Sequence, residues 1–168
     1  MKIQKYIGIC ILTIVSLMVV CMFTACGDDK DDDLPDGYYK TTEGVHRIDV
    51  SFSGDASGWD GATAFVATYG DGSHGFVKLY ENGKLLSNDG TFMGEDLRSY
   101  SVETEEKCDQ MSVTVTLVHD VSVSVSPVTV TLKSFINGQP KKIKTVEFTA
   151  RDSRRTIVFN SELDADVY

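Results

Sequence analysis

Hydrophobic and polar residues alternate along much of the chain, which is the pattern of β-strands with one buried face. In Val45–Phe52, the apolar residues Ile48, Val50 and Phe52 are separated by polar ones and fall on one face of a strand. Met111–Leu117 repeats the pattern, with apolar residues at odd positions and hydroxyl side chains between them. We expect both segments to be strands.

Turn residues divide the remaining strands. Asn82-Gly83 and Asn137-Gly138 each stand between two strand-like runs, and both residue types tolerate the positive φ that a two-residue hairpin requires. After Pro127 the apolar residues change from odd to even positions, so a break or bulge is expected there. Further strands are expected at 62–69, 76–80, 100–104 and 156–160, on both sides of Pro127 (Val121–Val125 and Val128–Leu132), and after Asn137-Gly138. Asn88–Arg98 is ambiguous and holds at most one helical turn, around Met93–Leu97.

Eight or nine short strands with regular turn signals and no long amphipathic helix predict an all-β fold. We expect one domain over residues 38–168, an antiparallel β-sandwich that is loosely immunoglobulin-like in architecture. The Cys…Trp…Cys signature of immunoglobulin domains is missing, so the expectation covers the architecture alone. A small β-barrel of the lipocalin kind is the alternative.

The N-terminus has the polarity of a secretory signal. Lys2 and Lys5 precede the uncharged, apolar run Tyr6–Ala25. At roughly 20 residues, this run is also long enough to span a bilayer, so an uncut transmembrane anchor is the alternative.

The end of this run resembles a bacterial lipobox, Phe23-Thr24-Ala25-Cys26. The resemblance implies that residues 1–25 are a lipoprotein signal peptide, and that Cys26 takes a diacylglycerol and a further acyl chain such as palmitate on its freed amine. Each buried methylene contributes ~0.8 kcal/mol, so two or more chains hold a protein on a membrane where one binds reversibly. Plain secretion remains the other possibility.

A run of acids follows Cys26 directly: Asp28, Asp29, Asp31, Asp32 and Asp33. This run resembles the export signal of surface-exposed lipoproteins of Bacteroidota-type bacteria, which implies a location on the outer membrane facing the cell exterior. The same residues are also expected to form a solvated, flexible tether over 26–37, because like charges repel and extend a chain.

Charge and cysteine content exclude some classes of function. Loss of Lys2 and Lys5 with the signal peptide changes the net charge from −9 to about −11, which argues against nucleic-acid binding. Cys10 and Cys21 leave with the signal peptide and Cys26 is the lipid site. Only Cys108 then remains, so an intramolecular disulfide is not expected.

The sequence shows no catalytic motif, and we expect neither an enzyme nor a cofactor. His46, His74 and His119 are far apart and form no metal-binding or nucleophile-activating pattern. Cys108 stands among acids, a setting that disfavours the thiolate. The Gly/Asp-rich loops 55–61 and 71–73 lack the order of a known calcium loop, so ordinary turns are expected and no metal site is assigned.

The candidate ligand-binding residues are aromatic. Trp59, the only tryptophan, stands in a glycine-rich stretch predicted as a loop and could be a platform for stacking on a sugar ring, with Tyr69 or Tyr80 beside it. The alternative is that Trp59 folds back as a plug over the open end of the sandwich.

Basic residues crowd the C-terminal hairpins: Lys133, Lys141, Lys142, Lys144, Arg151, Arg154 and Arg155. They are expected to protect an edge strand from pairing, or otherwise to dock an acidic polysaccharide or an acidic partner. We expect a non-catalytic surface binding module, and the resemblance to surface lipoproteins, which often capture polysaccharides, implies a glycan as the first candidate ligand. The alternative is a structural or accessory subunit of an outer-membrane or adhesive protein assembly, contacting its partner through a sheet edge or broad patch.

The lipobox resemblance generates a direct test. Cys26→Ala is expected to abolish lipid labelling and to leave the protein either uncut or released, because the acylated thiol is lost. Detergent phase separation after metabolic labelling with a fatty acid measures this. Unchanged partition of the variant into the detergent phase would contradict the anchor.

Overall fold

The computed structural model describes residues 42–69 and 77–162, all within the unit Lys40–Tyr168. Within these residues no helix is long and apolar enough to cross a membrane. The described chain forms ten strands: β1 His46–Gly54, β2 Trp59–Thr68, β3 Leu79–Glu81, β4 Lys84–Ser87, β5 Thr91–Gly94, β6 Tyr100–Thr104, β7 Gln110–His119, β8 Val128–Ile136, β9 Gln139–Phe148 and β10 Arg154–Asn160.

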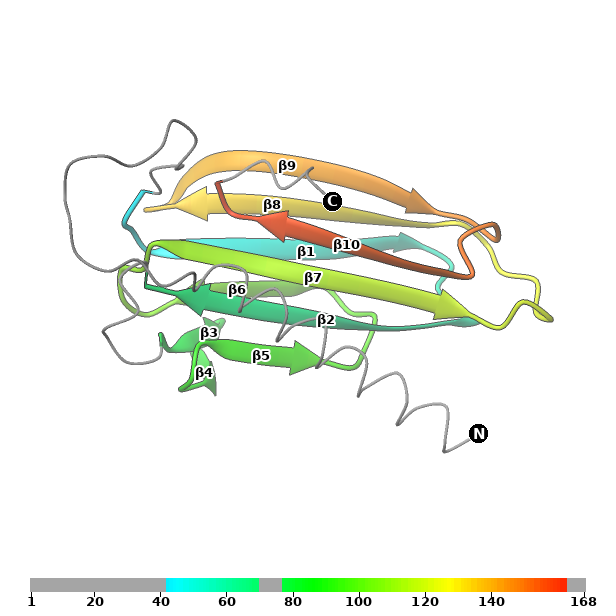
Figure 1. Cartoon of the computed structure of the whole chain (residues 1–168), viewed down its shortest axis with the longest axis horizontal. Helices are drawn as coiled ribbons and strands as arrows, with labels where there is room; N and C mark the ends of the chain where they lie inside the picture. The colour runs from blue at the N-terminus through cyan, green and yellow to red at the C-terminus, as the bar shows by residue number, and fades with distance from the viewer. Residues whose placement is uncertain (1–41, 70–76, 163–168) are drawn as a thin grey trace, which may run out of the picture. The chain divides into compact units, whose positions relative to one another are not determined.

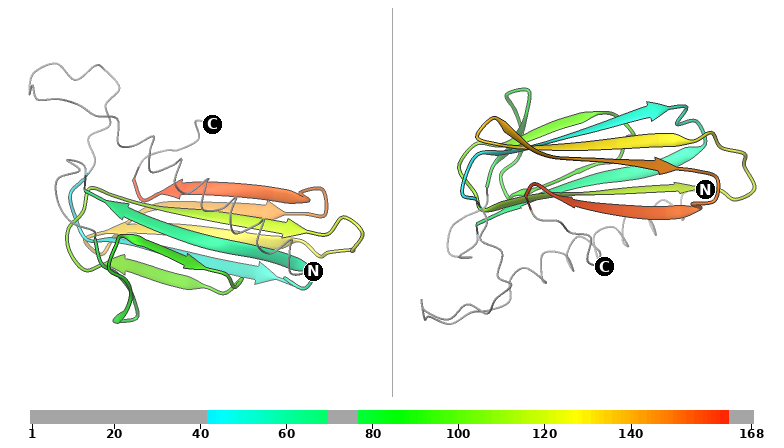
Figure 2. Two further views of the ribbon diagram at one scale, coloured as in Figure 1. Left: turned by 60° about the horizontal axis from the view of Figure 1, so that its bottom comes forward. Right: turned by 90° about the horizontal axis from the view of Figure 1, so that it is seen from above.

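The strands make two antiparallel sheets that face each other (Figure 1 and Figure 2). One sheet has six strands in the order β4-β3-β6-β1-β8-β9, and the other has four in the order β10-β7-β2-β5. The predicted β-sandwich is therefore confirmed, and the closed barrel is wrong. β1 lies between β6 and β8, both distant in sequence, so long-range pairing holds the centre of the larger sheet together.

The core lies between the inner faces of the sheets. Ile48 and Val50 of β1 are buried against the other sheet, where Val113 and Val115 of β7 are fully buried. Each fully buried aliphatic or aromatic side chain contributes on the order of 1.5–3 kcal/mol. An aromatic contact also links the sheets, because the rings of Phe65 in β2 and Tyr100 in β6 have centroids 5.9 Å apart.

Both predicted hairpin turns are confirmed. Asn82 and Gly83 have φ of 51° and 75° between β3 and β4, and Asn137 and Gly138 have φ of 52° and 75° between β8 and β9. Positive φ at both central residues matches the right-handed twist of the flanking strands.

Three local expectations differ from the structure. Trp59 is the first residue of β2 and does not lie in a loop. The segment around Met93 is strand β5, because Phe92 pairs with Phe65 on the neighbouring strand β2 and their rings pack together. The strand expected over Val121–Val125 is instead part of the loop between β7 and β8, whereas the expected strand break near Pro127 is confirmed, since these strands belong to different sheets. Phe76, the expected start of a strand, lies outside the described residues.

A buried histidine joins the two ends of the described chain. His46 has no exposed surface, its Nε2 lies 3.1 Å from the Thr42 carbonyl oxygen, and its Nδ1 lies 2.7 Å from Ser161 Oγ. A carbonyl oxygen can only accept, so Nε2 carries the proton and Nδ1 accepts from Ser161. Thr42 donates from both N and Oγ1 to the Glu162 carboxylate at 2.6 Å.

This network predicts how stability depends on pH. Burial lowers the pKa of His46 below its ordinary value of 6.5, although the nearby Glu162 and Asp109 oppose the shift. The unfolded chain therefore binds the proton more readily, and the free energy of unfolding should fall as pH drops through about 6.5 and below.

Urea unfolding monitored by circular dichroism between about pH 7.5 and 5 measures this fall. His46→Gln cannot titrate in this range, so its unfolding midpoint should depend less on pH than that of the parent protein. Equal pH dependence in both proteins would contradict a buried, neutral His46.

Candidate functional site

The structure places Trp59 in the core. Only 6% of its surface is exposed, and its ring makes edge contacts with His119 and Phe148 at centroid distances of 4.8 and 6.3 Å. Its Nε1 donates to the Ser126 carbonyl oxygen at 2.8 Å. The ring thus closes one end of the sandwich, as in the plug alternative, and has no free face for a sugar.

Tyr69 and Tyr80 lie together, apart from Trp59. The Tyr69 hydroxyl donates to Glu106 at 3.2 Å and the Tyr80 hydroxyl donates to Glu105 at 3.1 Å, so both contact one acidic turn. Trp59 begins β2, whereas Tyr69 follows its last residue. The three predicted ligand-binding residues therefore do not form one site.

Tyr80 instead belongs to a row of side chains on the outer face of the six-stranded sheet. In the strand register, Tyr80 of β3 pairs with Glu103 of β6, Glu103 with Arg47 of β1, and Arg47 with Phe135 of β8. Their sequence neighbours, such as Ile48 and Leu79, are buried, and alternation turns the row outward. We call Tyr80, Glu103, Arg47 and Phe135 the outer row.

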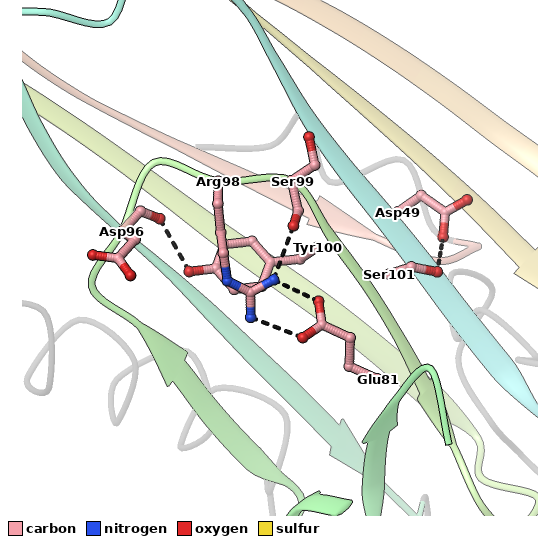
Figure 3. Close-up of polar contacts among 7 residues, drawn as sticks. All are labelled: Asp49, Glu81, Asp96, Arg98, Ser99, Tyr100 and Ser101. Atoms are coloured by element: carbon pink, nitrogen blue, oxygen red, sulfur yellow. Dashed lines mark hydrogen bonds and ion pairs between the residues drawn. The ribbon is translucent and has the colours of Figure 1, made fainter. Parts of the chain in front are cut away.

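Contacts within the sheet hold Arg47 in place. Its guanidinium carbon lies 4.0 Å from the centre of the Phe135 ring, and its Nε lies 3.2 Å from Asp49 Oδ1. Asp49 Oδ1 in turn accepts a hydrogen bond of 2.7 Å from Ser101 Oγ (Figure 3). A stacked and ion-paired guanidinium is a planar set of donors with little freedom left to lose on binding.

A shallow depression adjoins the Tyr80 end of the outer row. It has a volume of about 350 Å³ and is lined by Val45, Tyr80, Gly83, Glu103, Thr104 and Glu105. Lys78 lies 2.8 Å from Glu105 and lowers the pKa of that carboxyl, so Glu105 is ionised at neutral pH. The depression is open, because a Cβ at Gly83 would meet no atom within 4 Å.

An ion pair fixes the hairpin that carries Tyr80. The Arg98 guanidinium donates two hydrogen bonds of 2.8 Å to the two carboxylate oxygens of Glu81, the residue after Tyr80 (Figure 3). Arg98 also lies 4.0 Å above the Tyr100 ring, and the Tyr100 hydroxyl donates to the Asp96 carbonyl oxygen at 3.0 Å. Arg98 lowers the pKa of Glu81, which is mostly buried and stays charged.

Cys108 is the free cysteine of the described residues, and it is buried. Cys108 has no exposed surface and burial raises its pKa to about 12, which keeps it as an unreactive thiol at neutral pH. Residues 42–69 and 77–162 contain no group of three or more His, Cys, Asp or Glu side chains placed to hold a metal ion. Asp55 accepts a hydrogen bond from the Ser57 backbone, as in an ordinary turn, and Asp71 lies outside the described residues.

Part of the basic C-terminal cluster covers the open side of the sandwich. β9 and β10 are edge strands of opposite sheets. Lys142 Nζ lies 5.2 Å from the centre of the Phe159 ring, and the Arg155 guanidinium lies 5.6 Å from that of Phe148. Charges pointing toward the gap between edge strands discourage pairing with another chain, which favours the edge-protection hypothesis.

Arg47, Glu103 and Phe135 are not among the candidate residues that the sequence pattern predicts. A signal for them was present, because Phe135 falls at an odd position in a strand whose buried residues, Val128, Val130 and Leu132, are even. An aromatic residue in the outward phase of an alternating strand marks a surface that binding can use.

Comparison with known proteins supports the fold alone. The sequence matches no family model and no curated protein. A DUF4425 family protein from Bacteroides ovatus is 21% identical with a TM-score of 0.59, covering 71% of this chain and 94% of its own. A DUF4425 domain of unknown function from Bacteroides vulgatus is 16% identical with a TM-score of 0.60, covering 72% and 97%. A protein from Parabacteroides distasonis, solved in its calcium-bound form, is 20% identical with a TM-score of 0.53, covering 71% and 88%.

The position of Trp59 can be tested by substitution. Trp59→Ala should lower the free energy of unfolding by about 3–5 kcal/mol, because a large core ring is lost. Trp59→Phe keeps most of the apolar contact and loses only the hydrogen bond to Ser126. Its free energy of unfolding should therefore fall by less than that of Trp59→Ala. Urea unfolding followed by circular dichroism measures both. Wild-type stability in Trp59→Ala would show that the ring is not in the core.

Proposed function

We propose that this chain is a non-catalytic binding module, held on the outer membrane by a lipid at Cys26 and facing the cell exterior, whose outer row binds a glycan. The observation that carries the proposal is the alignment of Tyr80, Glu103, Arg47 and Phe135 across four adjacent strands of an open sheet face. The resemblance of Phe23-Thr24-Ala25-Cys26 to a lipobox, and that of the following acids to an export signal, support the proposed location.

The chemistry of the outer row suits a sugar. Pyranose rings present apolar C–H faces that pack on aromatic side chains, and their hydroxyls pair with planar polar groups. Tyr80 and Phe135 are half-buried aromatics at the two ends of the row, with Glu103 and Arg47 between them. The adjoining depression of about 350 Å³ is within the size range of small-molecule sites.

The sheet edges formed by β9 and β10 are weaker candidates for binding. Extended partners bind edges through free backbone groups, but charged side chains lie along the β9–β10 side of this sandwich. The face of the six-stranded sheet carries the aligned aromatic and charged groups instead.

The test uses the chain from Asp28 to Tyr168 in affinity electrophoresis against a panel of polysaccharides. We expect at least one neutral polysaccharide to retard it, and Arg47→Ala to weaken that binding by about tenfold or more through lost hydrogen bonds. Ser53→Ala is the matched control, because Ser53 lies exposed on the same face of the same strand, away from the outer row.

Two results would overturn the glycan proposal. One is that no polysaccharide in the panel retards the protein, and the other is that Arg47→Ala and Ser53→Ala bind equally well. Melting curves of both variants establish that folding is intact, since Arg47 is a partly exposed residue whose ion pair contributes little to stability.

An accessory role in a protein assembly is the second candidate, and one observation favours it. Val121 and Val123 in the β7–β8 loop are 80% and 47% exposed, at the end of the sandwich opposite to His46. Apolar loop tips of this kind are used in protein contacts. Loss of cross-linking to a surface protein in a Val121→Ser, Val123→Ser double variant, with no polysaccharide bound, would favour this function.

A further inference from the structure

We propose that the outer row is a series of subsites for a neutral, linear, β-linked oligosaccharide of about four sugar units, running across the strands from Tyr80 to Phe135. This inference rests on the proposed glycan-binding function and specifies the length and charge of the ligand.

The length follows from the strand order. β3, β6, β1 and β8 are consecutive neighbours in the sheet, so Tyr80 and Phe135 are three inter-strand steps apart. At roughly 4.8 Å for each step, the backbone positions of these residues are about 14 Å apart. In an extended β-linked glycan, the length of one sugar unit is comparable to the spacing between adjacent strands. About one sugar unit would therefore lie over each strand.

The charge follows from the carboxylates along the row. Within the described part of the chain, no hydrogen bond or ion pair engages the Glu103 carboxylate. Glu105 adds a second carboxylate at the depression, where Lys78 is paired with it, and Arg47 is paired with Asp49. Lys133 also faces outward on β8, two residues from Phe135, at the end of the row away from the depression. An anionic sugar would meet repulsion from Glu103 and Glu105, whereas a neutral sugar can donate its hydroxyl hydrogens to these carboxylates.

The two ends of the row have different roles. Tyr80 and Glu103 line the depression, which is the most recessed part of the site and can hold a short ligand alone. Phe135 is three strands away, and a ligand reaches it only after passing Glu103 and Arg47. Contact with Phe135 should therefore depend on the length of the oligosaccharide, whereas contact with Tyr80 should not.

The first arm of the experiment measures affinity against chain length by isothermal titration calorimetry. The probes are cello-, xylo-, manno- and laminari-oligosaccharides of about two to six units. For the series that binds, we expect affinity to rise by about tenfold or more up to about four units and then level off. Phe135→Ala should remove this rise and leave the affinity for the shortest bound oligomer unchanged, and Ser53→Ala should change neither.

The second arm tests charge with oligogalacturonides, which carry a carboxylate on every unit. The parent protein should reject them in favour of the neutral series. Glu103→Gln removes the negative charge and keeps an oxygen that accepts hydrogen bonds from sugar hydroxyls. The variant should therefore still bind the neutral oligosaccharides, and the ratio of its affinities for neutral oligosaccharides and oligogalacturonides should fall by about tenfold.

Failure of this inference is distinguishable from failure of the proposed function. If oligosaccharides bind through Arg47 but affinity does not depend on length, or if oligogalacturonides bind the parent protein equally well, the subsite series is wrong and glycan binding stands. If no oligosaccharide or polysaccharide binds, both are wrong.

Discussion

Burial of one face of every central strand is the constraint on which this structure depends. A strand alternates its side chains between two faces, so placing Ile48, Val102 and Leu132 in the core turns Arg47, Glu103 and Lys133 outward. A slip of one residue in β1 would bury Arg47 and expose Ile48, and the loss of apolar burial prevents it. The core thus determines which side chains stand on the outer face, and the inter-strand register determines which of them become neighbours.

The two ends of the sandwich are closed by different chemistry. At one end, the Trp59 indole covers the core and donates its N–H hydrogen bond to the Ser126 carbonyl oxygen. At the other, His46 and Ser161 form a fully buried polar pair. A buried polar pair is costly if either partner is lost, because the remaining group is left unsatisfied. The His46 end is therefore the one that responds to pH, whereas the Trp59 end is held mainly by apolar contact.

Local features of this fold could be predicted from sequence, and non-local ones could not. The phase of β1 and β7 follows from alternation, and Asn82-Gly83 and Asn137-Gly138 are turns because those residues accept positive φ. Strand β5 has only four residues and no alternation, so the packing of Phe92 against Phe65 decides its conformation. The glycine and aspartate residues around Trp59 predict a loop, but the structure places Trp59 at the start of β2 with its ring in the core. The outer row joins residues between 47 and 135, and no pattern within one segment reveals that register.

The proposed anchor and the outer row must also be compatible in space. Arg47 is the second residue of β1, so the outer row lies toward the end of the sandwich at which the described chain begins, with Thr42. A lipid at Cys26 would thus hold the nearer end of the domain, and the reach of the intervening chain decides whether the membrane blocks the row. The stretch from Cys26 to Thr42 can span at most roughly 55 Å when fully extended, and the repulsion among Asp28, Asp29, Asp31, Asp32 and Asp33 favours extension. That reach exceeds the roughly 34 Å length of a ten-residue strand such as β7. In the proposed arrangement, a chain extended in this way would leave the outer row accessible to a long polymer, which would give the acids a physical role apart from any export signal.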